Sequence, residues 1–243
     1  MPDLKKTSAH KYFQETRFNR DTLGRQIRSS ISPCETYKKY PDKKNIILPR
    51  TWENQGKSFW EVLQHRRSRR RFSGNTMSLP DLARLLWAAQ GITAQAGAHF
   101  FRTSPSAGAL YPIETYVAAG NIEGVKQGMY HLNVAEFLLE EISLESHIGK
   151  EVAQASLDQS FMENSSAIFI WSAIFRRNMS KYGNRGGRYI CMDVGHICQN
   201  LLLAAENLGF SACPVAAFYD DEVNDLLHID GQEESVLYLA AVG

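Results

Sequence analysis

Three stretches of the chain carry residue types that bind small polar ligands or move protons. The first covers residues 66–72, RRSRRRF, in which five arginines surround one serine. Each guanidinium offers a planar fork of donors that fits two phosphate oxygens, and the Ser68 hydroxyl adds a further donor. The pattern therefore fits a phosphate monoester. A solvated basic surface is an equal alternative. A nucleic-acid patch is a weaker one, because no second basic stripe or set of interleaved aromatic residues accompanies it.

The second stretch is a loop within residues 99–114, HFFRTSPSAGALYPIE. Pro105 and Pro112 fix φ and remove two backbone donors. Gly108 permits a positive φ or the close approach of a ligand to the backbone. The free amides between the two prolines can line a flat ligand with polar edges. The alternative is a simple turn that leads into the next strand.

The third stretch, residues 179–188 (MSKYGNRGGR), connects a buried strand to a long helix. Lys181 and Tyr182 place an ammonium and a phenol side by side near the start of that helix. They can act as a phosphate partner or as acid–base groups, and a plain surface charge is the alternative. Asp193 and His196 lie three residues apart on the helix and are interpreted as a structural pair.

Composition and charge exclude several classes of protein. The chain has 243 residues, and 44% of them are hydrophobic, as expected for a globular protein. Its formal net charge is +1, so it has no strong electrostatic field that would attract nucleic acid or an anionic membrane. No apolar run is long enough to cross a bilayer, and the N-terminus lacks the apolar core of a signal peptide. The four cysteines form no CxxC pair and indicate reduced thiols. We therefore expect a cytoplasmic protein that binds neither membrane nor nucleic acid.

The common catalytic motifs are absent from the sequence. No GxGxxG follows a strand, and no Walker A, HExxH or GxSxG motif occurs. No set of residues has metal-ligand spacing, so no metal site is expected. Any cofactor must therefore be held by another kind of pattern.

Helix and strand signals are mixed without strict βαβ alternation, which predicts one α+β domain with a mixed sheet. Helices are predicted at residues 58–65, at 78–91 between Ser78 and Gly91, at 143–157, 187–208 and 220–227. Strands are predicted at residues 114–119, 128–132, 136–142, 166–175, 210–218 and 235–242. Ser58 and Glu61 are predicted to form a capping box, and Ser143 is predicted to cap the helix at 143–157. Gly195, inside the helix at 187–208, indicates close approach of another helix or a ligand. Residues 1–57 are predicted to be an extended arm that packs on another surface, such as a partner subunit, and residues 58–243 form the domain.

The motifs RRSRRRF, PSAGALYPIE, KYGNR, DVGHICQNLLLAAENLG and CPVAAF occur in the order typical of one family. Over residues 58–243 the chain resembles the nitroreductase superfamily, and within it the branch of SagB-type dehydrogenases that oxidise thiazoline and oxazoline rings. The resemblance implies a nitroreductase-like α+β fold with a mainly antiparallel sheet flanked by helices. It also implies a homodimer that binds FMN at its interface.

The resemblance assigns roles to individual residues. The FMN phosphate and ribityl chain would be held by Arg66, Arg67, Ser68 and Arg70. The isoalloxazine would be bordered, from the other subunit, by Pro105, Ser106, Ala107 and Gly108. The strand beneath the ring would be formed by Val215, Ala216 and Ala217. The catalytic pair of the azole-forming members would be Lys181 and Tyr182.

Two features depart from the family pattern. Many nitroreductases place a Lys or Arg near the C-terminus that also reaches the phosphate, whereas this sequence ends at Val242 and Gly243. Many also carry a Glu where this chain has Ala216. We therefore expect the phosphate contact, and any contact that rests on that Glu, to come from elsewhere.

The implied function is an FMN-dependent oxidoreductase that moves a hydride by a ping-pong mechanism. As a reductase it would take hydride from NAD(P)H and pass it to a small-molecule acceptor such as a nitro or quinone compound. As a SagB-type dehydrogenase it would oxidise azoline rings in a modified peptide, with peptide-modifying partner proteins. A flavin-binding protein without turnover, one that consumes its flavin, and a basic nucleic-acid binder are the other hypotheses.

Overall fold

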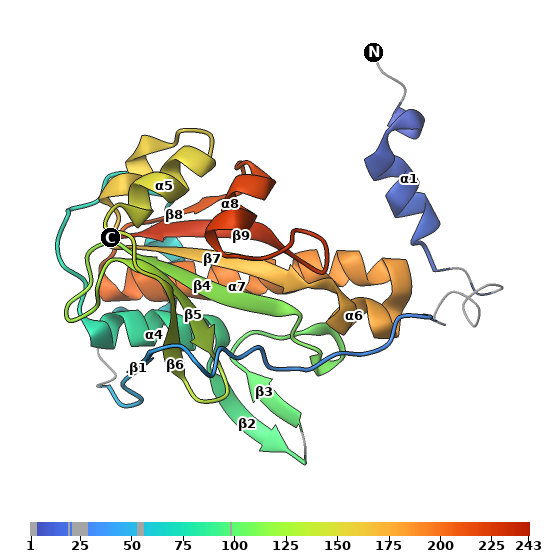
Figure 1. Cartoon of the computed structure of the whole chain (residues 1–243), viewed down its shortest axis with the longest axis horizontal. Coiled ribbons are helices and arrows are strands. Elements are labelled where there is room, and N and C mark those ends of the chain that lie inside the picture. Colours follow the sequence, from blue (N-terminus) through green and yellow to red (C-terminus); the bar gives the residue numbers. More distant parts are fainter. Residues whose placement is uncertain (1–3, 19, 21–28, 53–55, 98) are drawn as a thin grey trace.

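The computed structural model describes residues 4–18, 20, 29–52, 56–97 and 99–243. Its centre is a seven-stranded sheet in the order β1-β6-β5-β4-β7-β9-β8, and every neighbouring pair is antiparallel. The strands are β1 (Asn45–Ile47), β4 (Ile113–Ala119), β5 (Gly128–Asn133), β6 (Leu138–Ser143), β7 (Ala167–Ile174), β8 (Ala212–Val215) and β9 (Glu234–Val242). A separate hairpin of β2 (Ile92–Ala96) and β3 (His99–Arg102) projects from the body (Figure 1). The predicted α+β fold with a mainly antiparallel sheet is confirmed.

Helices cover both faces of the sheet (Figure 1). The α-helices are α1 (Ser8–Glu15), α3 (Phe59–His65), α4 (Leu79–Gln90), α5 (Ile148–Ala155), α6 (Phe175–Tyr182), α7 (Gly186–Leu208) and α8 (Asp220–Leu226). Short 3₁₀ turns occur at Leu4–Lys6, Ala107–Ala109, Ser160–Asn164 and Gly183–Arg185. Helices α4 and α7 pack on one face, and α5 and α8 pack on the other. No helix in the described part of the chain is long and apolar enough to span a bilayer.

Strand β7 lies at the centre because its side chains are apolar on both faces. Phe169 and Trp171 pack toward α4 and α7, whereas Ile168 and Ile170 pack toward α5 and α8. A continuous apolar run suits a strand that is buried on both faces. The sheet thus provides a rigid floor for the segments that connect its ends.

Local capping signals predicted several helix ends correctly. The Ser58 hydroxyl accepts from the Glu61 amide, and the Glu61 carboxylate accepts from the Ser58 amide at 2.8 Å. Ser78 caps α4 by accepting from the Asp81 amide. Gly209, with φ at 84°, ends α7 in the left-handed conformation that glycine adopts easily.

Three predicted boundaries were wrong. Ser143 ends β6 and pairs with Met129, so the following helix begins only at Ile148. The predicted strand at 166–175 ends earlier, because the unpredicted helix α6 begins directly at Phe175. The predicted strand at 210–218 is confined to β8, which ends at Val215. In each case a pairing or packing contact decided the boundary.

The arm packs on its own chain wherever the structure describes the contact. Strand β1 pairs with β6, and Lys38 Nζ donates to the Tyr116 hydroxyl at 2.6 Å. Near the N-terminus, the guanidinium of Arg188 donates to the Thr16 hydroxyl at 2.8 Å. The arm's packing on a partner subunit stays a prediction.

Candidate active site

The loop of residues 105–111, here called the site loop, is anchored on α7. The Ser106 hydroxyl donates to Asp193 Oδ2 at 2.5 Å, and the Ala107 amide donates to Oδ1 at 3.3 Å. Ser106 Oγ also accepts from the Tyr111 amide at 2.9 Å. Burial raises the pKa of Asp193, and the bonds from Ser106 and Ala107 offset only part of that rise. The hydrogen bonds of Asp193 go to the site loop, whereas the expected partner His196 interacts with it electrostatically and lowers its pKa.

The backbone of the site loop is strained. Gly108 has φ of 66°, Ala109 of 54° and Tyr111 of 45°. A left-handed conformation at a residue other than glycine costs about 1 to 3 kcal/mol and persists only where the surroundings over-determine it. Strain of this kind concentrates at functional sites.

Lys181 and Tyr182, at the end of α6, face Gly108. A Cβ atom at position 108 would lie 2.6 Å from Tyr182 Oη and 2.9 Å from Lys181 Nζ. Lys181 is exposed and Tyr182 is half-buried, with its ring edge-to-face against Tyr189. The fold thus joins the predicted catalytic pair to one of the predicted ring-bordering residues, more than seventy residues away.

Residues 66–71, the arginine segment, run beside β8. The Arg69 amide donates to the Ala212 carbonyl at 2.9 Å, and Ser68 forms a parallel bridge with Ala212. Arg69 itself, which was not a predicted ligand residue, is paired with the buried carboxylate of Glu206 at 2.5 Å. The fold therefore brings the residues that are predicted to bind the phosphate next to the strand that is predicted to lie beneath the flavin ring.

Three arginines of this segment remain available to a ligand. Among the described residues, no ion pair joins Arg66, Arg67 or Arg70 to a carboxylate. The Arg70 guanidinium lies 5.7 Å from the ring centre of Phe161. Their charge is therefore free to neutralise a phosphate.

The end of β8 offers an open backbone. Val215 is buried on the strand, whereas Ala216 and Ala217 follow it and are exposed. The Ala217 carbonyl accepts from Gln159 Nε2 at 3.0 Å, which fixes the segment. Methyl side chains leave room for a flat ligand to lie against the peptide groups.

Comparison with known proteins identifies the family. The model of the nitroreductase family matches residues 63–243. The chain belongs to the nitroreductase family. It is therefore an oxidoreductase, and its site loop, its arginine segment and every strand of the sheet except β1 lie within the matched region.

Three relatives show how closely this nitroreductase-family chain resembles known proteins. It is 39% identical to the provisionally named nitroreductase MJ1384 of Methanocaldococcus jannaschii, over 75% of this chain and 89% of that protein. It is 34% identical to the trifolitoxin-processing protein TfxB of Rhizobium leguminosarum bv. trifolii, over 58% of this chain and 39% of TfxB. It is 26% identical to the microcin B17-processing protein McbC of Escherichia coli, over 58% of this chain and 54% of McbC. The chain thus spans about half or less of the two processing proteins.

Solved structures agree on the fold. A provisionally named nitroreductase of Anabaena variabilis has a TM-score of 0.78 at 24% identity, over 96% of this chain and 45% of that one. A chain of the E. coli microcin synthetase McbBCD complex with truncated pro-MccB17 bound has a TM-score of 0.62 at 21% identity, over 97% and 91%. A nitroreductase of Desulfovibrio desulfuricans, also provisionally named, was solved in complex with FMN and has a TM-score of 0.53 at 16% identity, over 78% and 87%. At these identities the likeness concerns the fold alone.

Two carboxylates of α7, the long helix that extends across the molecule (Figure 1), anchor the two halves of the candidate site. Asp193 holds the site loop, and Glu206 holds the arginine segment. The two residues are 13 positions apart, and at a rise of 1.5 Å per residue that is about 20 Å along the helix. The two segments therefore have separate anchors on one helix.

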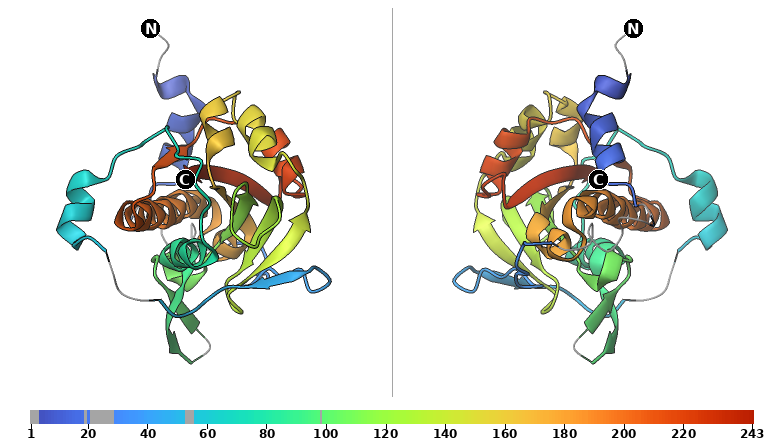
Figure 2. Two further views of the ribbon diagram at one scale, coloured as in Figure 1. Left: turned by 90° about the vertical axis from the view of Figure 1, so that its left-hand side faces the viewer. Right: turned by 90° about the vertical axis from the view of Figure 1, so that its right-hand side faces the viewer.

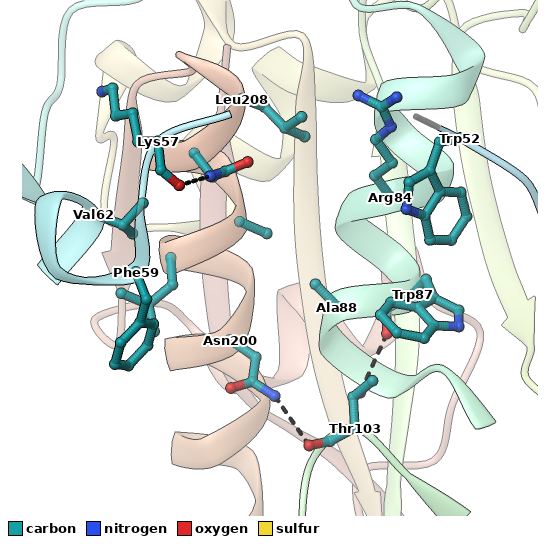
Figure 3. Close-up of a pocket in the computed structure, with 13 residues that line it drawn as sticks. Trp52, Lys57, Phe59, Val62, Arg84, Trp87, Ala88, Thr103, Asn200 and Leu208 are labelled. Atoms are coloured by element: carbon teal, nitrogen blue, oxygen red, sulfur yellow. Dashed lines mark hydrogen bonds between the residues drawn. The ribbon is translucent and has the colours of Figure 1, made fainter. Parts of the chain in front are cut away.

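A cavity of about 470 Å³ lies between α3, α4 and α7 (Figure 3). Figure 2 shows α3, the cyan helix, standing apart from the body beside α7. The wall is mostly apolar, with Trp52, Phe59, Trp87 and Leu208 among its residues. None of the predicted site residues lines this cavity. Lys57 lines the cavity, and its ammonium pairs with Glu206 at 2.6 Å. Glu206 also pairs with Arg69, so this carboxylate links the cavity wall to the arginine segment.

Sequence reasoning missed two residues that shape the site. Asp193 anchors the site loop, although its position on a helix suggested only a partner on the same helix. Arg177 donates to the Tyr111 carbonyl at 3.1 Å, yet no motif singled it out. Charged residues beside apolar runs were the available signal, but their partners lie far away in the sequence.

Proposed function

We propose that this chain is an FMN-dependent oxidoreductase that moves a hydride by a ping-pong mechanism, with a donor leaving before an acceptor enters the same face. The observation that carries the proposal is the bridge from Ser68 to Ala212. It sets the free guanidiniums of the arginine segment beside the open backbone of Ala216 and Ala217. This combination of phosphate donors and a flat peptide surface suits FMN.

The residues present fit that cofactor. Arg66, Arg67 and Arg70 would bind the phosphate with Ser68, because no described carboxylate neutralises the three guanidiniums. The peptide groups after Val215 would support the ring. When bound, FMN would supply the acceptor and donor of hydride, and the protein would supply position and electrostatics. Fixed backbone donors at the ring edge would orient it without reorganisation.

The proposed working form is a homodimer. The arginine segment of one protomer would then meet the site loop, Lys181 and Tyr182 of the other, because the anchors Glu206 and Asp193 lie about 20 Å apart along α7. The middle of α7 supports this arrangement, because Met192 is 56% exposed and no described atom lies within 4 Å of a Cβ placed at Gly195. Trp60 on α3, 76% exposed, extends the apolar surface.

Small molecules are the first proposed substrates, with NAD(P)H as donor and a nitro or quinone compound as acceptor. We also propose that the protein works in the cytoplasm, in line with its four free cysteines. The arm of residues 1–57 and the domain of residues 58–243 are the proposed units of the chain.

The visible absorbance spectrum of the purified protein tests the cofactor. We expect a yellow protein with flavin bands that bleach when NADPH is added without air. A yellow protein that does not bleach would keep FMN and remove the nicotinamide donor. A colourless protein that also refuses added FMN would overturn the proposal.

A second function is favoured by Lys181 and Tyr182. We propose as the alternative a SagB-type dehydrogenase that oxidises thiazoline or oxazoline rings in a modified peptide, with partner proteins. The names of TfxB and McbC, as processing proteins of trifolitoxin and microcin B17, support it. Such a ring loses one hydride and one proton, so a base must lie beside the hydride acceptor. Lys181 Nζ and Tyr182 Oη, both close to Gly108, are placed to hold that proton.

A further inference from the structure

A row of buried charged groups lies beneath the site loop. His131 Nδ1 lies 2.8 Å from Glu140 Oε2, and its Nε2 lies 2.9 Å from Glu114 Oε2. A carboxylate only accepts hydrogen bonds, so both ring nitrogens carry protons and His131 is an imidazolium. Burial lowers the pKa of His131, but the hydrogen bonds to Glu114 and Glu140 outweigh it and leave that pKa raised. The sheet itself assembles this row, because His131 stands directly opposite Glu140 on β6 and opposite Tyr116 on β4.

Arg177 connects this row to the site loop. Its Nη1 donates to Glu114 Oε1 at 2.5 Å and to the Tyr111 carbonyl at 3.1 Å. Its Nε donates to the carbonyl of Glu35 in the arm at 2.7 Å. Arg177 is 4% exposed, so these partners replace the water that its charge would otherwise hold.

Tyr111 is held from a second side by Arg102. The Tyr111 hydroxyl accepts from the Arg102 amide at 3.1 Å, and the Arg102 guanidinium lies 4.4 Å from the centre of the ring. Arg102 is fixed in turn, since its Nη1 donates to Gln90 Oε1 at 2.6 Å. We call Arg102, Tyr111 and Arg177 the Tyr111 clasp.

The clasp acts at the strained end of the site loop. The Tyr111 amide donates to Ser106 Oγ, so the residue that Arg177 grips by its carbonyl is also bonded to the start of the loop. Tyr111 has φ of 45°, a conformation that needs several fixed partners to persist. Releasing the carbonyl would remove one of the fixed partners that hold this geometry.

Arg177 also lies on α6, one turn before Lys181. The same rigid helix therefore carries the proposed catalytic pair and the group that grips the loop opposite that pair. Any shift of α6 would move Lys181, Tyr182 and the Tyr111 carbonyl together. This arrangement keeps the spacing between Gly108 and the pair constant.

We propose that Arg177, backed by Glu114 and His131, is a positioning residue that holds the site loop against Lys181 and Tyr182. Its effect on the loop stands on the contacts of this chain alone, whereas its effect on flavin and turnover rests on the proposed function. Arg177 touches neither of the proposed catalytic side chains in the described structure and acts through Tyr111.

Hydrogen exchange of the cofactor-free protein, followed by mass spectrometry, tests the proposal. The variant is Arg177→Lys, which keeps a buried positive charge for Glu114 but loses the fork that reaches three acceptors. We expect amides of residues 105–111 to exchange about tenfold faster or more, while those of β4 and β7 keep their wild-type rates. Arg176→Lys is the matched control. Arg176 is the neighbouring arginine on α6 and makes an exposed pair with Glu233, so its variant should exchange like the wild type.

Two outcomes would overturn the proposal. Unchanged exchange in the site loop would show that Arg177 does not restrain it. Equal acceleration in the loop and in the two strands would show that Arg177 only stabilises the fold. If Arg177→Lys does not fold, Glu114→Gln decides, because it keeps Arg177 but removes the carboxylate charge that holds its guanidinium in place. Faster exchange confined to the loop would then support the clasp, and none would end it.

Titration of the same proteins with FMN separates this inference from the proposed function. If both hold, Arg177→Lys binds FMN about tenfold more weakly or worse, and Arg176→Lys binds it normally. A wild-type protein that takes up no FMN would end the proposed function, but the exchange rates of the site loop would still decide whether Arg177 restrains it.

Discussion

Gly108 lies so close to Tyr182 that a Cβ atom at position 108 would fall 2.6 Å from the phenolic oxygen. The contact excludes every side chain from the tip of the site loop. It also sets the loop backbone directly against the polar ends of the pair. A change at Gly108 therefore acts directly on the pair, which makes this contact the sharpest test of the site.

Gly108→Ala should abolish turnover by displacing Tyr182 and Lys181. The positive φ adds a stability cost of about 1 kcal/mol. Gly124→Ala is the matched control, because Gly124 has φ of 72° and nothing lies within 4 Å of its Cβ position. Both variants should lose similar stability in urea unfolding, and only Gly108→Ala should lose activity. Equal activity of the two variants would remove Gly108 from the site.

Replacing Arg66 and Arg70 together by Ala should weaken FMN binding by about a hundredfold or more, because each charge-assisted contact to a phosphate contributes about 1.5 to 3 kcal/mol. Fluorescence titration of the cofactor-free protein measures the change. Arg69→Ala should instead lower the free energy of unfolding, because it leaves the buried carboxylate of Glu206 with Lys57 alone. Normal flavin affinity in the double variant would refute the phosphate assignment.

Lys181→Ala separates the two proposed functions. In a SagB-type dehydrogenase it should stop oxidation of a synthetic peptide that carries one thiazoline, with flavin content unchanged, because the base for the ring proton is lost. In a small-molecule reductase, NADPH oxidation should survive. Mass spectrometry of the peptide and absorbance of NADPH give the two readings, and Lys150→Ala, an exposed lysine on α5, serves as the control. Loss of both activities with normal flavin content would show that Lys181 serves either reaction.

The sequence predicted what depends on near neighbours. Ser58 and Glu61 are three residues apart and bond to each other, so their capping box was visible in the sequence. Helix α6 was missed because it begins without a side-chain cap, directly after β7. Ser143 was assigned to the following helix because its pairing with Met129 across β5 and β6 is not a local feature.

The site was predictable only in part for the same reason. The arginine segment, the site loop and the Lys181–Tyr182 pair are contiguous motifs, and the order of these motifs located them. Arg177 and His131 carry charges inside apolar surroundings. A charged side chain, judged from the sequence alone, is expected at the surface. Only the strand pairing and the start of α6 bring them to Glu114. Their role follows from contacts across 17 and 63 positions of the chain.

The buried Glu114 carboxylate should make stability depend on acid pH. Burial raises the pKa of Glu114, but the Arg177 guanidinium and the His131 hydrogen bond outweigh it and lower the pKa from 4.5 to about 2. Its contribution is therefore complete above pH 4.5 and is lost as the pH falls toward 2. That loss amounts to as much as about 3 kcal/mol.

Urea unfolding of the wild type and of Glu114→Gln between pH 7 and pH 2 measures this contribution. The difference in unfolding free energy should shrink as the pH falls, because protonation makes the wild type resemble the variant. Glu136→Gln, at an exposed pair with Lys39, should show no such convergence. A difference that stays constant down to pH 2 would mean that Glu114 does not titrate with a lowered pKa.

Mixing two inactive variants tests whether the site is shared between protomers. The double variant Arg66→Ala/Arg70→Ala keeps an intact site loop and Lys181, whereas Gly108→Ala keeps an intact arginine segment. If the site forms across a homodimer, a mixed dimer contains one site built from two wild-type halves and one site with both defects. Random exchange of equal amounts makes half of the dimers mixed, so about a quarter of the wild-type activity should return. Sedimentation of the mixture would verify that dimers are present. Dimers that regain no activity would place both halves of each site in one protomer, against the separation of Asp193 and Glu206 along α7.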